Sequence, residues 1–449
     1  MAGAALPAAV LLGVLVGTEL GLGIAFALAI AFGAVALLDL PLAIAFWIGL
    51  AFSRNLTIVW VGPTLASLVV LFAWLGASRD VWRRRAAVAG RHRGIVAATL
   101  LLLIWLTLSA LWAGNPAAVA ADVWTWWLAV VVAVVVATAL RSPRDVRVVV
   151  TGFVVGAAVS VLIGLALTGL APVSDAVQSA ATGEPKRLSG GLADPNYLAA
   201  GLVPAIVLGC ALLGAARGLV GRLLLAVSIA LCAVGLAATE SRGGLIAAGV
   251  AALASLVVFR QRGRVALGLV LVLAVGGVYF TATPGALGRI SGLDGGGSGR
   301  SDLWRVAWRI GETQPIRGIG LNNFVSRSQD FVREPGVLRD VHVIVERPVL
   351  VHNLYLQIGV ETGIVGLSLF LAVIGGLLLV GLRAARRFDA RGDPEMSTLA
   401  RAVFVAQLSA LVALVFLSAG TDWRWWTLFG LGPALLALAS RRGPPAARA

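Results

Sequence analysis

The sequence predicts an all-α, polytopic integral membrane protein with one long external loop at residues 284–352. Of its 449 residues, 59% are hydrophobic and only 13% are charged, and the mean hydropathy is +0.95. The apolar residues come in blocks of about 20, the length that an α-helix needs to cross the hydrocarbon core of a bilayer. These blocks predict roughly twelve to fourteen transmembrane helices. Residues 284–352 form the only long stretch of the sequence that is not dominated by apolar residues.

The first 53 residues are almost entirely apolar and are interrupted only by Glu19, Asp39 and Pro41. We expect two or three spans there, retained in the membrane, because no Lys or Arg precedes Arg54 as a signal peptide would require. Further spans are predicted near 56–77, 94–113, 121–140, 147–170, 196–215, 222–239, 243–259, 265–283, 354–382, 399–419 and 424–440. The chain therefore divides into N-terminal helices (1–283), the loop (284–352) with interfacial helices, and C-terminal helices with a short basic tail (353–449).

The formal net charge of +15 is concentrated in every second connection between spans. We therefore interpret it as an orientation signal and expect no nucleic-acid partner. The positive-inside rule places these connections and both termini in the cytoplasm, and the connections 114–120, 171–195, 240–242, 284–352 and 420–423 on the outer face of the cytoplasmic (inner) membrane. The basic connections carry Arg79–Arg93, Arg141–Arg147, Arg217 and Arg222, Arg260–Arg264, Arg383–Arg391 and Arg441–Arg448.

The external loop contains nine arginines, although it lies on the face that the positive-inside rule leaves poor in positive charge. Its glycine-rich stretch 294–299 indicates flexible backbone, and residues 300–310 have the spacing of a helix. We expect this helix at the membrane surface, with its two indole rings at the interface and its guanidinium groups turned to polar ligands. One face would carry Asp302, Arg305 and Arg309, another Leu303, Ala307 and Ile310, with Trp304 and Trp308 one turn apart.

Four segments, all assigned to the outer face, together resemble the O-antigen ligase and O-antigen polymerase superfamily of bacterial membrane glycosyltransferases. Their order along the chain and their common side carry the resemblance, which covers about residues 185–370. The segments are Arg187–Gly190 with Asp194–Ala199, then Glu240–Gly244, then Gly299–Arg300 followed by Trp304, Ala307, Pro315, Gly318, Gly320 and Phe324, and finally His352–Tyr355 with Glu361–Gly366.

The resemblance implies a fold like that of GT-C membrane glycosyltransferases and an enzyme that transfers a glycan from a polyprenyl (undecaprenyl) pyrophosphate carrier to an acceptor hydroxyl. It also implies that Arg187, Arg242, Arg300 and His352 are functional residues. The acceptor stays open between a glycolipid such as lipid A core, another glycan, a wall polymer and a protein. The alternatives within the superfamily are a polymerase of glycan repeats and a protein O-glycosyltransferase.

The chemistry of this reaction suits these residue types. Arginine offers a permanent charge and a planar donor fork that matches phosphate oxygens, so Arg242 and Arg300 would bind the pyrophosphate and stabilise the charge that develops as it leaves. A neutral His352 would accept the proton of the acceptor hydroxyl.

The other candidate residues surround these three. Gly243 and Gly244 would let a ligand approach the backbone closely. Arg187 would bind substrate or instead pair with Asp194 or Glu184. Asn353 and Tyr355, which follow His352 in its motif, are placed at the substrate, and Arg305 and Arg309 at secondary phosphate contacts or on the surface.

We expect neither a metal nor another cofactor, because the external connections contain no Asp-x-Asp or similar carboxylate pair that would bind a divalent cation. Cys210 and Cys232 lie inside apolar blocks and have no spacing typical of a disulfide or metal site. A transporter is the minor alternative. It would place ionisable groups at the bilayer midplane and repeat one half of the chain in the other, whereas the charges here lie at the ends of spans.

Overall fold

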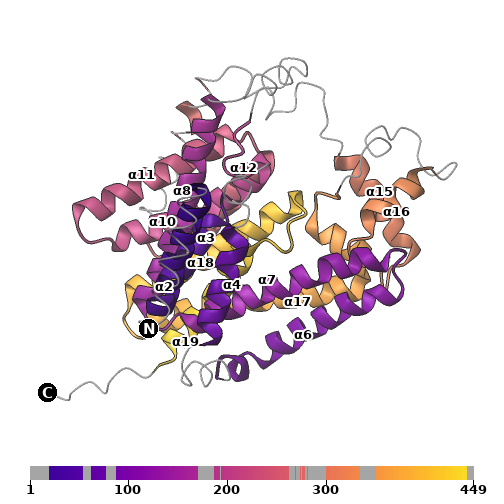
Figure 1. The fold of residues 1–449 in the computed structure, drawn as a ribbon, viewed down its shortest axis with the longest axis horizontal. Helices are drawn as coiled ribbons and strands as arrows, with labels where there is room; N and C mark the ends of the chain where they lie inside the picture. Colours follow the sequence, from indigo (N-terminus) through magenta and orange to yellow (C-terminus); the bar gives the residue numbers. More distant parts are fainter. Residues whose placement is uncertain are drawn as a thin grey trace.

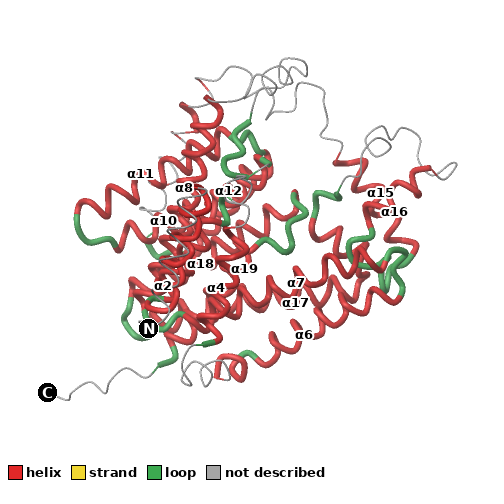
Figure 2. Tube along the Cα trace, in the orientation of Figure 1, coloured by secondary structure: helices red, strands yellow, loops and turns green. Residues whose placement is uncertain are grey.

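The structure is a computed structural model, and it describes residues 20–53, 62–76, 87–169, 187–192, 194–261, 268, 274, 276–278, 281, 300–333 and 350–441. In these ranges the chain is helical and forms no strand, which confirms the all-α prediction (Figure 2). Seven of the helices within them are long and apolar enough to cross a membrane, and four more are apolar but shorter. The protein is thus a multi-pass membrane protein. The span predicted at 265–283 and the glycine-rich stretch lie almost wholly outside the described residues.

The helices fall close to the apolar blocks of the sequence. In chain order they are α2 (Leu20–Leu38), α3 (Leu40–Leu50), α4 (Gly62–Leu75), α6 (Arg93–Leu108), the 3-10 turn η2 (Ser109–Leu111), α7 (Pro116–Ala139), α8 (Pro143–Gly169), α10 (Pro195–Ala215), α11 (Leu219–Ala238), α12 (Arg242–Val258), α15 (Arg300–Thr313), α16 (Phe324–Arg333), α17 (Leu354–Asp389), α18 (Pro394–Ala413), the 3-10 turn η3 (Leu414–Phe416) and α19 (Trp423–Ala439).

Several helices begin at an acidic or amide side chain followed by proline. Asn115, Asp194 and Asp393 each accept a hydrogen bond from a backbone N–H in the first turn of the helix that follows, at 3.2, 2.6 and 3.0 Å respectively. The proline after each of them has no N–H to leave without a partner, and its fixed φ suits a first turn. These short polar signals therefore fix where α7, α10 and α18 enter the apolar layer.

The most buried helices, α18 and α19, form the core of the molecule (Figure 1). Helix α18 packs against α10, α12 and α17, and α19 packs against α7, α17 and α18. The Gln407 side chain of α18 donates to the carbonyl oxygen of Leu428 in α19 at 2.7 Å, which fixes these two helices to each other in an apolar environment. Helices α6 and α11 lie further out and leave many apolar side chains exposed, as lipid-facing helices do.

Helix α17 is interrupted at Gly363, whose φ of 69° and ψ of −175° are not helical. The segment 315–320 runs along this break. Backbone bonds join Ile319 N–H to the Val360 carbonyl (3.1 Å), Gly320 N–H to the Glu361 carbonyl (2.8 Å) and Ile364 N–H to the Pro315 carbonyl (2.9 Å). Two of the segments that carry the family resemblance are therefore paired directly through their backbones. We call this pairing the backbone clasp.

The helix predicted at residues 300–310 is present as α15, and Leu303, Ala307 and Ile310, which the sequence placed on one face, are buried. They pack against α16 and against residues that include Val360 of α17, so protein covers this apolar face. The opposite face is open to solvent, and Trp308 is 64% exposed. Helix α15 is thus fixed to the transmembrane bundle through its apolar side.

The basic connections gather at one end of the bundle, here called the basic end. Arg217 lies 4.0 Å from Glu395 and Arg260 lies 3.6 Å from Asp389, and the Arg441 side chain donates to the carbonyl oxygen of Arg141 at 2.6 Å. Helices α10 and α12 run from this end to the opposite one, where Asp194 and Arg242 lie. We call that opposite end the motif end. The two ends correspond to the alternating basic and non-basic connections of the sequence.

Candidate functional site

The four segments that carry the resemblance meet at the motif end. Helices α10 and α12 both begin there, α15 begins there with Arg300, and residues 350–353 lead into α17 there. Segments that are more than 150 residues apart in the chain therefore supply side chains to one region. The candidate residues of each segment are described in turn.

Arg187 connects the first two segments. Its Nε donates to the carbonyl oxygen of Thr239 at 2.8 Å, and its Nη2 donates to Oδ1 of Asn196 at 3.2 Å. The same Asn196 oxygen accepts the hydroxyl of Ser241 at 2.8 Å. The predicted substrate ligand Arg187 thus has a visible role in the fold, because it joins the turn before α10 to the end of α11 and, through Asn196, to the cap of α12.

Arg242 is the first residue of α12, and its side chain is exposed. The glycines that follow pack closely against other parts of the protein, and the ligand approach that the sequence suggested there stays a prediction. A Cβ at Gly243 would lie 2.9 Å from the ring of Phe416, and one at Gly244 would lie 2.7 Å from Cβ of Ala199. Protein therefore already occupies the space beside both glycines. Their small size lets α12 begin close to η3 and α10 and leaves Arg242 at the surface.

Trp304 fixes the first turn of α15 in place. Its indole nitrogen donates to the carbonyl oxygen of Val351 at 3.1 Å. Its ring lies 6.5 Å, between centroids, from that of Phe416, the residue that contacts Gly243. One aromatic side chain from η3 thus separates the start of α12 from α15. This arrangement holds Arg300 and Arg242 in the same region.

His352 lies between Val351 and the helix cap of α17, in a left-handed backbone conformation with φ of 52°. This conformation is costly for a residue other than glycine, and such residues often mark functional sites. Its neighbour Asn353 caps α17 by accepting the N–H of Leu356 at 3.1 Å. The Tyr355 hydroxyl donates to the carbonyl oxygen of Leu411 at 2.7 Å. Both predicted substrate residues thus stabilise the start of α17 in the structure.

The charges of four residues at the motif end interact. Burial lowers the pKa of His352 below its ordinary 6.5, and the charge of Arg300 lowers it further, whereas that of Asp194 opposes the shift. Burial also lowers the pKa of Arg300, with Asp194 opposing and Arg242 adding to the shift. We call Asp194, Arg242, Arg300 and His352 the site cluster. The sequence analysis quoted Asp194 within its motif but assigned it no catalytic or binding role.

The arrangement of the site cluster favours an anionic ligand. The guanidinium groups of Arg242 and Arg300 repel each other, and Arg300 also interacts with the Asp194 carboxylate and with His352, whose lowered pKa favours the neutral form near pH 7. An anion between the two arginines would relieve their repulsion and accept several charge-assisted hydrogen bonds. Among the described residues no group of three or more His, Cys, Asp or Glu side chains could hold a metal ion.

Arg305 and Arg309 lie on the exposed face of α15. Arg305 is 63% exposed and lies 3.6 Å from Asp302, one turn earlier in the same helix. Exposed pairs of this kind contribute little to stability. Of the sequence candidates on α15, only Arg300 is therefore electrostatically coupled to His352 in the structure.

The sequence analysis did not single out the buried ion pair beside this site. Arg424 and Asp422 lie 2.6 Å apart and are both buried, and Arg424 also donates to the carbonyl oxygen of Tyr197 at 3.1 Å. The Tyr197 hydroxyl donates to the carbonyl oxygen of Ser418 at 2.9 Å. The signal was an arginine inside the apolar block that begins at 424. The pair anchors the start of α10 to the start of α19.

A family model matches part of the chain. The family model described as O-antigen ligase matches residues 227–371. The matched region contains Arg242, Arg300 and His352, but Arg187 and Asp194 lie before it. A search of curated proteins gives no match. Residues 227–371, which include α12, α15 and the first part of α17, are therefore similar to the O-antigen ligase family, in agreement with the superfamily that the sequence motifs resemble.

Proposed function

We propose that this protein transfers a glycan from a polyprenyl pyrophosphate carrier to an acceptor hydroxyl at the outer face of the cytoplasmic membrane. The observation that carries the proposal is the site cluster, in which Arg242, Arg300 and His352 interact electrostatically at the motif end. All three residues lie within the region matched by the O-antigen ligase family. The charge pattern of the connections supports an external motif end.

In this proposal the acceptor oxygen attacks the anomeric carbon of the glycan. A new carbon–oxygen bond forms while the bond from that carbon to the pyrophosphate oxygen breaks. The electron pair leaves with the pyrophosphate, and the acceptor hydroxyl gives its proton to the imidazole of His352. Negative charge grows on the leaving oxygen, so preplaced guanidinium groups stabilise the transition state more than the ground state. Arg242 and Arg300 fill this role.

The lowered pKa of His352 supports its role as a base. A histidine that is neutral at pH 7 can accept a proton, whereas an imidazolium cannot. The positive charge of Arg300 contributes to keeping it neutral. Asp194 would then stabilise the imidazolium that forms when the hydroxyl loses its proton. We call Arg242 and Arg300 the pyrophosphate clamp. The charge of the clamp residue Arg300 thus influences the protonation of the base, His352.

The test uses the full chain, reconstituted in vesicles, with a lipid-linked glycan as donor. Donor binding and glycan transfer are measured side by side for wild type and for His352→Asn. Asparagine tolerates the left-handed backbone of residue 352 but is not a base. We expect donor binding to persist and transfer to fall about 10²- to 10⁴-fold, the usual contribution of a general base.

The matched control is Asn322→His, which places a histidine at another left-handed position outside the site cluster. It should transfer glycan like wild type and should not rescue His352→Asn. Normal transfer by His352→Asn would remove the histidine from the mechanism. Release of the pyrophosphate carrier without any glycosylated acceptor would contradict transfer as the function.

A further inference from the structure

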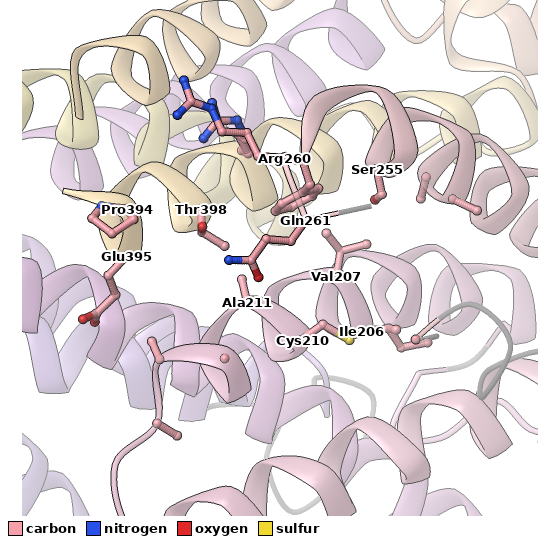
Figure 3. A pocket seen from close by; sticks show the side chains of 18 of the residues that line it. Ile206, Val207, Cys210, Ala211, Ser255, Arg260, Gln261, Pro394, Glu395 and Thr398 are labelled. Atoms are coloured by element: carbon pink, nitrogen blue, oxygen red, sulfur yellow. The ribbon is translucent and has the colours of Figure 1, made fainter. Parts of the chain in front are cut away.

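A cavity of about 650 Å³ lies between α10, α11, α12 and α18. Its walls are mainly apolar and include Val207 and Ala211 of α10 and Ala251 and Ala252 of α12. Figure 3 shows Val207 and Ala211 beside the opening, with Gln261 reaching between Ala211 and Thr398. None of the candidate residues for glycan transfer lines this cavity. It is therefore a separate feature of the fold.

The cavity is long in the direction of the helices. Along α12 its lining runs from Ala248 to Phe259, just past the end of that helix. This separation corresponds to about 16 Å at the α-helical rise of about 1.5 Å per residue. Half of a bilayer's hydrocarbon core is about 15 Å thick. The cavity thus has the length of one leaflet, and its lining reaches the basic end.

The mouth of the cavity is positively charged. Arg217, Arg222, Arg260 and Arg401 line it together with only two carboxylates, those of Asp389 and Glu395. The side chains of Arg217 and Arg260 are 93% and 77% exposed. Four guanidinium groups against two carboxylates leave an excess of positive charge. This excess lies where lipid headgroups meet the ends of the helices.

We propose that this cavity binds one acyl chain of an anionic membrane phospholipid, with the headgroup phosphate held by Arg217 and Arg260. An apolar shaft one leaflet long fits a hydrocarbon chain, and a basic mouth between transmembrane helices fits an anionic headgroup. The hydroxyl of Thr398 and the amide of Gln261, both near the mouth, can donate hydrogen bonds to the ester oxygens of the lipid.

The pyrophosphate of the polyprenyl donor is assigned to the opposite end of α12. Arg242 begins α12, whereas Arg260 lies just beyond its end. The two arginines are separated by about 27 Å along the helix axis. A single pyrophosphate cannot contact both. The phospholipid site therefore stands independently of the proposed transfer reaction and would stabilise the α10–α12–α18 contact from the opposite end.

The experiment uses the full chain in phosphatidylcholine vesicles that contain a trace of phosphatidylglycerol with a diazirine in one acyl chain. After illumination, cross-linked peptides are identified by mass spectrometry. We expect cross-links on α10 and α12 near Val207 and Ala252. A phosphatidylcholine probe with the same diazirine should cross-link there at least threefold less.

Two pairs of variants test the shaft and the mouth. Ala252→Trp fills the cavity and should abolish the cross-links, whereas Leu253→Trp, at a neighbouring residue that is 67% exposed and does not line the cavity, should not. The double variant Arg217→Gln/Arg260→Gln should lose the preference for phosphatidylglycerol. Arg386→Gln/Arg387→Gln removes the same charge near the same end, outside the cavity lining, and should keep that preference. Ala211→Leu is a milder filling variant if Ala252→Trp does not fold.

Three results would overturn the proposal. The first is equal capture of both probes by wild type, because the mouth would then not select an anionic headgroup. The second is unchanged cross-linking in both filling variants. The third is displacement of the probe by micromolar polyprenyl pyrophosphate but not by excess unlabelled phosphatidylglycerol, which would assign the cavity to the donor lipid.

Discussion

The indole nitrogen of Trp304 donates a hydrogen bond to the carbonyl oxygen of Val351, 3.1 Å away. The first turn of α15, which carries Arg300, is thereby fixed to the residue that precedes His352. The proposed base and the proposed clamp are thus held together by one side chain. Its loss should affect catalysis more than donor binding.

Trp304→Phe keeps a ring beside Phe416 but removes the hydrogen bond to Val351. We expect kcat to fall about fivefold, since the net contribution of such a bond is about 1 kcal/mol, and the KM for the donor to change little. Trp308→Phe is the control on the same helix, because the indole of Trp308 bonds only within α15, to Glu312 at 2.8 Å. Steady-state kinetics of both variants check this. Equal effects from the two substitutions would separate Trp304 from the positioning of His352.

The clamp depends on the planar shape of arginine. Arg242→Lys and Arg300→Lys keep the charge but lose the bidentate donor fork, so each should lower transfer by at least tenfold. Arg317→Lys is the control, because Arg317 lies on an exposed turn before α16, where its Nε donates to Gln314. Transfer at saturating acceptor is the measurement. If both clamp variants turned over like the control, the pyrophosphate would have to be held elsewhere.

The pH dependence of transfer tests the coupling within the site cluster. The pKa of His352 is lowered, so activity should fall as the pH drops and should reach half of its maximum at a pH below the usual 6.5. Asp194→Asn removes the charge that raises this pKa, so the acid limb should move to lower pH. Arg300→Gln removes a charge that lowers it, so the acid limb of the residual activity should move to higher pH. Shifts in the same direction in both variants would contradict the assignment of the limb to His352.

The backbone clasp between 315–320 and α17 leaves no room for a side chain at Gly363. A Cβ there would lie 2.0 Å from the Ile316 carbonyl oxygen, and φ is 69°. Gly363→Ala should lower the free energy of unfolding by more than the roughly 1–2 kcal/mol that a left-handed backbone costs. Gly359→Ala, where the nearest atom is 3.5 Å away, should be neutral or stabilising by up to about 1 kcal/mol.

Thermal unfolding of the detergent-solubilised protein and protease cleavage of the segment 300–333 measure the two glycine variants. Faster cleavage is expected for Gly363→Ala alone. Similar stability and cleavage rates in both variants would indicate that the clasp does not hold the loop segment.

Much of this architecture was predictable, because long apolar blocks and Asn-Pro or Asp-Pro starts are local signals. The helix at residue 300 was predictable because its polar and apolar residues recur with helical spacing. The break at Gly363 was not, since it depends on backbone groups of a segment about 45 residues earlier in the chain. The left-handed backbone of His352 and the packing of Gly243 on Phe416 likewise depend on tertiary contacts.

The sequence indicated which residues belong to the candidate site. It did not indicate which other groups these residues contact. Motif order indicated Arg242, Arg300 and His352, and in the structure the charge of Arg300 interacts with Arg242 and with His352. The sequence did not indicate that the side chains of Arg187, Asn353 and Tyr355 each form hydrogen bonds with the backbone of the protein. The sequence offered Asp194 only as a possible partner of Arg187, whereas in the structure it caps α10 and its charge acts on Arg300 and His352.

Asp194 lies before the region that matches the O-antigen ligase family, and Asp422 and Arg424, which hold the start of α10 through Tyr197, lie after it. The region that matches the family, residues 227–371, is therefore smaller than the region that would have to be exchanged to transfer the whole site to another protein. A chimaera that swaps only residues 227–371 would combine the arginines and histidine of one protein with the carboxylate of another.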